Sequence, residues 1–292
     1  MQKRRFLPAA AVVLGGAGFL LRRWELSTAF EPSGLVTPGM PATMALTVLS
    51  VLAAVLCAAA GSALRKQDLG RFDALFALEG RPALLSGLVL SAFLLLAGAA
   101  LELAQIPVSY RTAVDVLMAN GTGSPILAAF LPAVLALLSL LSGIGILLAA
   151  RKRARGQSVG PYSGLLLAPG FLGCLWLIAA YQSRAGDPVV QDYLYELLAI
   201  MCVLLSSYYL ASFSYEDGKA GRCLCFSLLA VYFSITTLAD GHDWASMALY
   251  GFGILYPLTV SVLLLSREGS PRTAHTSPAE EEQKTEGDPN ER

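Results

Sequence analysis

The sequence predicts an all-α fold, a polytopic bundle of about eight membrane-spanning helices with both termini in the cytoplasm. Hydrophobic residues make up 55% of the 292 residues and charged residues only 14%, with a mean hydropathy of +0.59. A soluble domain carries about 25% charged residues. The apolar residues also cluster into runs of about 20, long enough to cross a hydrocarbon layer of roughly 30 Å. Lys and Arg are concentrated in alternate connecting segments, as in multi-pass membrane proteins.

The first predicted span, 6–21, follows a basic start and has an apolar middle, as a secretory signal does. It lacks a clear cleavage site between small residues, and Arg22 and Arg23 follow it at once. We therefore expect an uncleaved helix that stays in the membrane.

Further apolar runs predict the spans that complete a transmembrane bundle over 1–266. They lie at approximately 42–64, 83–104, 126–150, 162–181, 193–213, 223–238 and 244–265. The remaining segment, 267–292, is rich in Glu, Pro, Ser and Thr and almost free of apolar residues. Such a segment buries too little surface to offset its ordering entropy, so it predicts a disordered, acidic cytoplasmic tail.

The charge distribution predicts the orientation of the bundle. With the N-terminus inside, all but four of the 21 Lys and Arg residues fall on the inner side, as the positive-inside rule requires. The exceptions are Arg22, Arg23, Arg111 and Arg184, and long side chains at a helix end can snorkel to the interface. Short loops favour a plasma membrane protein, specifically one of a bacterial inner membrane.

Two carboxylates at the outer ends of predicted spans are the candidate binding groups. Glu102 ends a stripe of small residues in the third span, and Glu196 shares a helix face with mostly small residues in the sixth. Small residues mark close helix contacts in membranes, so both side chains should lean into the bundle. If they meet, they would share a proton or a cation, or Arg111 or Arg184 would pair with one of them. The alternative is structural, with each carboxylate capping its helix in the headgroup zone.

Helix-breaking residues interrupt three of the predicted spans. They are Pro132 in the fourth span, Pro169 and Gly170 in the fifth, and Gly253 and Pro257 in the eighth. Breaks free backbone groups and often line transporter cavities. They also occur as packing kinks without any site, because Pro and Gly are frequent in membrane helices.

One turn near the C-terminus has the composition of a ligand cluster. Asp240, His242 and Asp243 lie within four residues of one another and have side chains that bind divalent ions. Short interhelical turns are often rich in Asp and Gly for backbone reasons alone, so we expect no metal here. If one binds, these three residues are its ligands.

These features favour a small-solute transporter or permease component with an outward-facing acidic vestibule. The alternative is a non-catalytic membrane subunit or scaffold whose cytoplasmic loops meet a soluble or membrane partner. A membrane-embedded enzyme acting on lipid or quinone is a third hypothesis and would use Asp240, His242 and Asp243. No metalloprotease, nucleophile-elbow, phosphate-loop or dinucleotide motif is present, so we predict no catalytic residues and no cofactor. The sequence has no basic patch with interleaved aromatics, so the partner is the lipid bilayer and not a nucleic acid.

Overall fold

The structure is a computed structural model that describes residues 6–31, 37, 39–64, 72–76, 78, 80–121, 124–184, 189–215 and 218–267. These residues form helices joined by turns and short coils, with no β-strand among them. The predicted all-α class is therefore confirmed. Residues 268–292 of the predicted tail lie outside the described residues.

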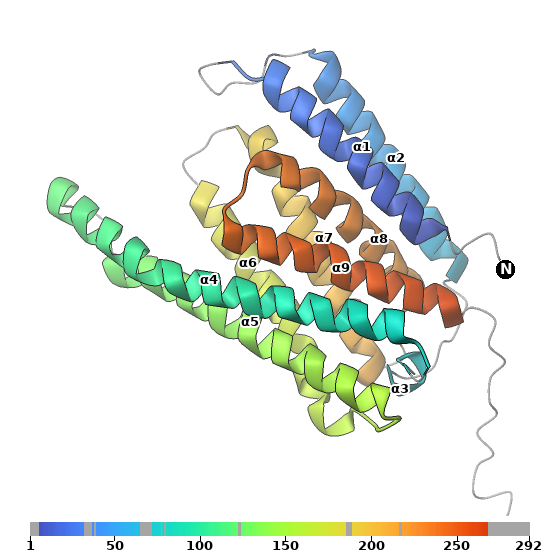
Figure 1. Cartoon of the computed structure of the whole chain (residues 1–292). Coiled ribbons are helices and arrows are strands. Elements are labelled where there is room, and N and C mark those ends of the chain that lie inside the picture. The colour runs from blue at the N-terminus through green and yellow to red at the C-terminus, as the bar shows by residue number, and fades with distance from the viewer. Residues whose placement is uncertain are drawn as a thin grey trace, which may run out of the picture.

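Helices α1 (Leu7–Thr28) and α2 (Pro41–Leu64) lie side by side on one flank of the molecule (Figure 1). Only 22% of the most apolar stretch of α2 is buried, compared with 67% for the stretch that contains α8 (Ala220–Thr237). α2 therefore faces the surroundings of the bundle, whereas α8 is enclosed by α1, α2, α7 and α9.

The opposite flank is a long helical hairpin of α4 (Pro82–Asn120) and α5 (Pro125–Ala154). The two helices have 39 and 30 residues. At 1.5 Å per residue, these lengths correspond to about 58 Å and 45 Å. The joined ends of the hairpin project beyond the other helices, and we call this projecting part the arm (Figure 1).

The length of α4 differs from the prediction, which ended the third span at residue 104 and placed an outer loop after it. The helix instead continues through Pro107 and ends before Gly121, whose φ of 66° is the left-handed conformation of a helix C-cap. The residues between 104 and 121 contain no glycine that would end the helix earlier. An apolar run predicts where a helix crosses lipid, not where it stops.

The predicted fifth span is a composite of two kinds of helix. A 3₁₀ segment, η2 (Gly160–Leu167), leads directly into α6 (Ala168–Arg184). Pro169 therefore lies in the first turn of α6, where proline is tolerated because that amide has no partner within the helix. α7 (Val190–Tyr215) follows.

The chain ends with α8, the short η3 (Leu238–Asp240) and α9 (Trp244–Arg267). Glycines allow α8 to approach its neighbours closely. A Cβ built on Gly61 of α2 would lie 2.4 Å from the Gly221 carbonyl oxygen at the start of α8. The short α3 (Phe72–Leu75) lies between α2 and α4 in the chain.

Contacts between distant residues show how the helices run. Arg22 near the end of α1 meets Asp240 after α8, so α1 and α8 are parallel. Arg81 before α4 meets Ser266 at the end of α9, so α4 and α9 are antiparallel. The bundle therefore has two ends, which we call the Arg22 end and the Arg81 end; the arm projects at the Arg22 end.

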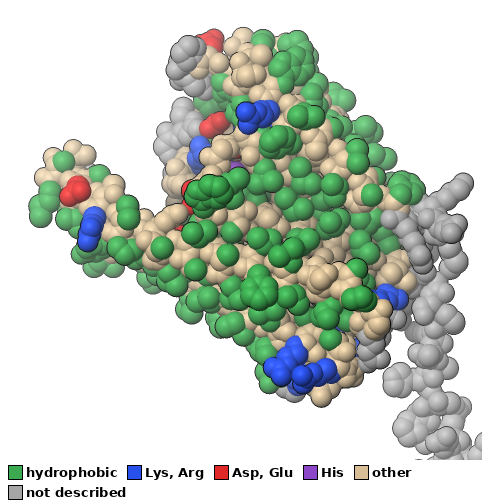
Figure 2. All heavy atoms as spheres, in the orientation of Figure 1, with side chains coloured by type: hydrophobic (Ala, Val, Ile, Leu, Met, Phe, Trp, Pro, Cys, Tyr) green, Lys and Arg blue, Asp and Glu red, His purple; other side chains and the backbone are tan. Residues whose placement is uncertain are grey.

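Among the residues that the structure describes, seven helical segments are long and apolar enough to cross a membrane. α1 is not among them, because Arg22, Arg23 and Glu25 lower the hydropathy of its last turns. Hydrophobic side chains cover the long sides of the helices, and Lys and Arg side chains gather where α5 ends (Figure 2). An apolar surface of this extent suits lipid and not water. The chain is a multi-pass helical membrane protein.

Candidate functional site

A buried guanidinium group lies at the centre of the most polar part of the interior. The Arg22 side chain is 0% exposed, so it does not snorkel to the interface as the sequence suggested. Its Nε donates to Asp240 Oδ1 at 2.6 Å and its Nη1 to Glu25 Oε2 at 2.8 Å. Its Nη2 donates to the backbone carbonyl oxygen of Asp192 at 2.5 Å. Desolvation of a charge this deep is costly, and these partners offset it.

The end of α6 adds a second arginine to the same region. Arg184, the last residue of α6, lies between two carboxylates of α7. Its Nη1 is 3.4 Å from Asp192 Oδ2, and its Nε is 3.6 Å from Glu196 Oε2. The predicted pairing of Arg184 with Glu196 is thus an ion pair in the structure, shared with Asp192.

Glu196 forms a hydrogen bond through only one of its two carboxylate oxygens. Its Oε1 accepts a hydrogen bond from the Tyr250 hydroxyl of α9 at 3.1 Å, while its buried Oε2 accepts none. The residue is only 8% exposed. The nearest cation to Oε2 is Arg184, whose Nε lies 3.6 Å away, beyond hydrogen-bond distance.

The turn after α8 closes a circuit of polar contacts. Thr237 Oγ1 donates to Asp240 Oδ2 at 2.9 Å, and His242 Nε2 donates to the Thr237 carbonyl oxygen at 2.8 Å. The His242 ring then packs on Tyr250, with 4.5 Å between the ring centroids. The connected side chains, which we call the polar cluster, are Arg22, Glu25, Arg184, Asp192, Glu196, Thr237, Asp240, His242 and Tyr250.

The polar cluster is unbalanced in charge. It contains two guanidinium groups and four carboxylates, those of Glu25, Asp192, Glu196 and Asp240. Like charges held together in a medium of low dielectric constant repel strongly, so one carboxylate is expected to take a proton or attract a cation. Of the four, Glu196 has an oxygen that is both buried and without a hydrogen bond.

The candidate metal ligands do not converge. Asp240 and His242 point into the polar cluster, whereas Asp243 accepts hydrogen bonds from Gln105 Nε2 at 3.0 Å and from the Ser246 amide at 3.4 Å. Partial burial acts to raise the pKa of Asp243, but the hydrogen bonds from Ser246 and Gln105 outweigh it and lower that pKa overall. Within the described ranges, no three His, Cys, Asp or Glu side chains are arranged around a metal position.

Glu102 lines a separate cavity of about 520 Å³ between α4, α5 and α6. Most of the wall is apolar and includes Leu131, Pro132 and Leu135, while Gln182 and Ser183 add polar groups. Glu102 and Glu196 do not form the pair that the sequence suggested, because they lie on opposite sides of the end of α6. Ser183 faces the cavity and the next residue, Arg184, faces Glu196.

The other predicted residues are distributed through the fold. Arg111 is exposed on the arm and makes no contact with the polar cluster. Pro132 lines the Glu102 cavity, and Pro169 and Gly170 lie at the junction of η2 and α6. Gly253 packs against α7 and α8, where a Cβ would lie 2.9 Å from both Val203 and Ser234 side-chain atoms. Pro257 lies one turn further along α9.

Two central members of the polar cluster were not predicted as site residues. Arg22 carried a signal, because it is a cation on the side that the positive-inside rule leaves poor in cations. Tyr250 shares a stripe of small and polar residues with Gly253 and Pro257 in the eighth predicted span, but that stripe did not point to Glu196. The hydrogen bonds of Arg22 to Asp240 and of Tyr250 to Glu196 join residues that are 218 and 54 positions apart in the chain.

Comparison with known proteins identifies no relative: no family model, no curated protein and no solved structure matches this chain.

Proposed function

We propose that the protein is a proton-coupled transporter, or the membrane component of one, for a small solute. The polar cluster is its proton-binding site, and Glu196 is the group that takes the proton. The observation that carries this proposal is the buried Glu196 Oε2, which lacks a hydrogen bond in a cluster with more carboxylates than guanidinium groups. Ionisable residues within membrane helices commonly mark ion and proton pathways.

The proposal places the Arg22 end outside the cell and the Arg81 end in the cytoplasm, in a plasma membrane such as a bacterial inner membrane. The Arg81 end holds most of the described cations, as the positive-inside rule requires of the inner side. Among them are Arg81, Arg151, Lys152, Arg153, Arg155, Lys219 and Arg222. The discordant Arg22 is buried among acids of the bundle and does not belong to an outer loop.

The same reasoning makes α1 an eighth span. Its 22 residues cover about 33 Å, close to the thickness of the hydrocarbon layer. α1 packs along α8 and runs parallel to it. The charges that lower its hydropathy include Arg22 and Glu25, which neutralise each other inside the protein. Eight crossings put both termini on the cytoplasmic side.

Protonation of Glu196 gives the polar cluster two distinct states. When Glu196 is ionised, Arg184 lies between it and Asp192. When Oε2 holds a proton, the attraction to Arg184 falls and Asp192 remains as the stronger partner. One proton thereby changes the favoured position of α6 relative to α7. Coupling of proton binding to solute movement requires such a change.

The cavity beside Glu102 is the proposed solute site. Its volume of about 520 Å³ is within the usual range for small-molecule pockets. Apolar walls with one carboxylate suit a solute that has an apolar body and a cationic or hydrogen-bond-donating group. The last turn of α6 lines the cavity, so a movement of Arg184 would change the shape of the cavity.

The junction of η2 and α6 is the proposed hinge. Runs of 3₁₀ helix longer than three or four residues are uncommon and often mark hinges, and η2 has eight residues. Pro169 and Gly170 follow at once. A bend there would move α6, which contributes both Arg184 and the wall of the cavity.

The test uses purified protein in liposomes that contain a pH-sensitive dye. A panel of small amines and other organic cations is added outside at several pH values. We expect at least one solute to change the internal pH with the wild type, and Glu196→Gln to slow that change at least about tenfold, as loss of a proton carrier requires. Asp115→Asn, which removes an exposed carboxylate of the arm, is the matched control. A response that Glu196→Gln leaves intact would rule out this site.

A second candidate function is a membrane subunit that docks a partner through the arm. The arm exposes large apolar side chains, among them Met118 at 82%, Ile126 at 75% and Val108 at 64%. Apolar groups exposed beyond the bundle favour an interaction surface. The cytoplasmic loop and tail that the sequence suggested for a partner lie largely outside the described residues. Loss of a co-purifying partner on Met118→Asp and Ile126→Asp would favour this function over transport.

A further inference from the structure

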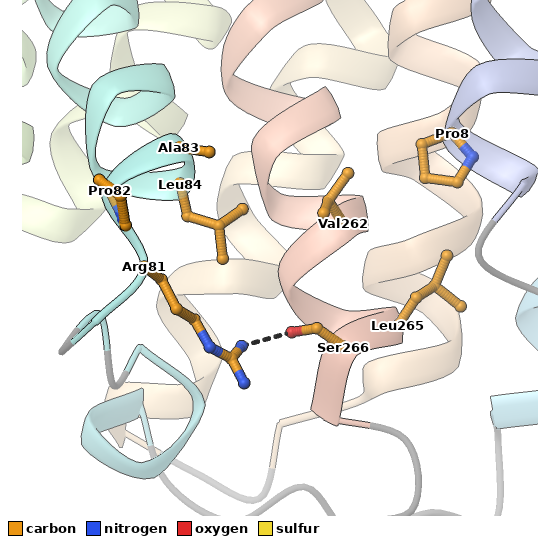
Figure 3. Close-up of a pocket in the computed structure, with 8 residues that line it drawn as sticks. All are labelled: Pro8, Arg81, Pro82, Ala83, Leu84, Val262, Leu265 and Ser266. Carbon is orange, nitrogen blue, oxygen red and sulfur yellow. Dashed lines mark hydrogen bonds between the residues drawn. The ribbon is translucent and has the colours of Figure 1, made fainter. Parts of the chain in front are cut away.

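A cleft at the Arg81 end has the shape and chemistry of an amphiphile site. It lies between the N-terminal residues of α1 and α4 and the last turns of α9, with a volume of about 430 Å³. Apolar residues from all three helices form its walls (Figure 3), among them Pro8, Leu84 and Leu265. Arg81 and Ser266 lie together at one end of the cleft (Figure 3).

The cationic group in this cleft has spare hydrogen-bonding capacity. Arg81 Nη1 donates to Ser266 Oγ at 2.7 Å, and no ion pair joins Arg81 to an acid within the described segments. A guanidinium group has five N–H donors, so most of them remain for an anion. Ser266 fixes the position of the group, because its own hydroxyl is held by the Leu263 carbonyl oxygen at 2.8 Å.

The backbone near Arg81 adds to the positive potential. Arg81 is the N-cap of α4, and no side chain caps the amides of the first turn. Unpaired amides and the helix dipole favour an anion at this position. Arg81 thus combines a side-chain cation and a helix N-terminus at the mouth of an apolar cleft.

We propose that this cleft binds an anionic phospholipid, with the phosphate on Arg81 and an acyl chain along the walls formed by α1, α4 and α9. Charge complementarity selects the anion, and the apolar walls select a chain-bearing molecule over a free anion. Basic pockets between membrane helices on the cytoplasmic side are known to suit such headgroups. The site requires only that the helices span a bilayer, and not that the protein transports a solute.

At the Arg81 end, bound lipid would join α1 and α4, which belong to different flanks of the bundle. α1 packs against α2 and α8, whereas α4 packs against α5 and α9. The cleft separates α1 from α4, and Pro8 of α1 and Leu84 of α4 line it from opposite sides (Figure 3). An acyl chain would occupy the volume of the cleft, which no described side chain occupies.

The experiment is native mass spectrometry of the full-length protein released from detergent with added lipid. Phosphatidylglycerol is compared with phosphatidylcholine of the same acyl chains and with inorganic phosphate. We expect phosphatidylglycerol to bind more tightly than phosphatidylcholine and Arg81→Ala to weaken it about fivefold, the effect of one basic group near an anionic headgroup. Arg155→Ala, at the same end but outside the cleft, is the control and should keep wild-type binding.

A second variant tests the walls independently of the charge. Ala83→Phe places a large side chain in the cleft and leaves Arg81 in place, and it should weaken phosphatidylglycerol binding while thermal stability is kept. Equal losses for Arg81→Ala and Arg155→Ala would show a diffuse charge effect and overturn the proposal. Inorganic phosphate binding as tightly as phosphatidylglycerol, or full binding by Ala83→Phe, would overturn it as well.

Discussion

At the scale of single residues, the polar cluster depends on Arg22. Its side chain contacts Glu25, Asp192 and Asp240, which come from three different parts of the chain. A buried ion pair contributes little net stability compared with an apolar replacement of both partners, but removal of one partner leaves an uncompensated charge. Arg22 therefore stabilises the fold mainly by neutralising the buried carboxylates of Glu25 and Asp240.

Replacing Arg22 by Met should therefore lower the free energy of unfolding by about 3–5 kcal/mol. Arg23→Met removes an exposed charge from the next position and should change it by less than about 0.5 kcal/mol. Equilibrium unfolding in mixed micelles measures both. The double variant Arg22→Met, Asp240→Asn should recover part of the loss, because the orphaned carboxylate is gone. Equal effects of Arg22→Met and Arg23→Met would contradict the buried network.

The sequence indicated some of these residues and not their arrangement. Glu196 was a candidate because it lies on a helix face of small residues, and Arg184 was a candidate as its partner; the structure joins the two. Glu102 was a candidate because it ends a similar stripe of small residues, yet it lines a separate cavity. Helical periodicity places a side chain on a face, but it does not say which neighbour that face meets. The hydrogen bond of Tyr250 to Glu196 could be recognised only from the structure.

At the scale of elements, close helix packing around α8 determines which glycines matter. Gly61 of α2 meets the Gly221 backbone, whereas Gly16 of α1 has no atom within 4 Å of an added Cβ. Association of membrane helices depends on such close contacts, because lipid supplies no hydrophobic drive.

Gly61→Ala should force α2 away from α8 and cost about 1–3 kcal/mol, the usual effect of overpacking. Gly16→Ala should be neutral or stabilising by up to about 1 kcal/mol, since alanine favours a helix more than glycine does. Thermal unfolding of the two variants in the same detergent compares them. If Gly61→Ala proves as stable as Gly16→Ala, α2 does not pack on α8 at Gly61.

Element boundaries were the part of the fold that the sequence predicted least well. The extension of α4 to Asn120 was missed, because the residues after Glu102 mix apolar and polar types and include Pro107. The 3₁₀ conformation of η2 was missed because its apolar composition is that of an ordinary span. Hydropathy measures the transfer of residues into lipid. It says little about whether a helix is α or 3₁₀, or about how far a helix extends beyond the bilayer.

At the scale of the whole molecule, the proposed topology fixes where each terminus lies. Eight crossings put both termini on the cytoplasmic side, whereas seven would separate them. Epitope tags placed at each end should both be protected from protease added to intact cells, and both should be cleaved after permeabilisation. Cleavage of the N-terminal tag alone in intact cells would show that α1 does not cross, and would leave seven spans.

The membrane class itself was predictable, because it depends on composition summed over many residues. Errors at single positions average out over a run of about 20 apolar residues. The polar cluster depends instead on a few contacts between distant segments, such as that of Arg22 with Asp240, which no average over one segment can reveal.

The distance along the chain between Arg22 and Asp240 has a consequence for biosynthesis. At about 5–20 residues per second, a ribosome takes roughly 10–40 s to add the 218 residues that separate them. During that delay α1 holds an arginine whose carboxylate from the final hairpin has not yet been made. Until Asp240 is made, Glu25 on the same helix is the carboxylate that can neutralise Arg22, so we expect α1 to enter the membrane with this local pair and to gain Asp240 only when α8 packs against it.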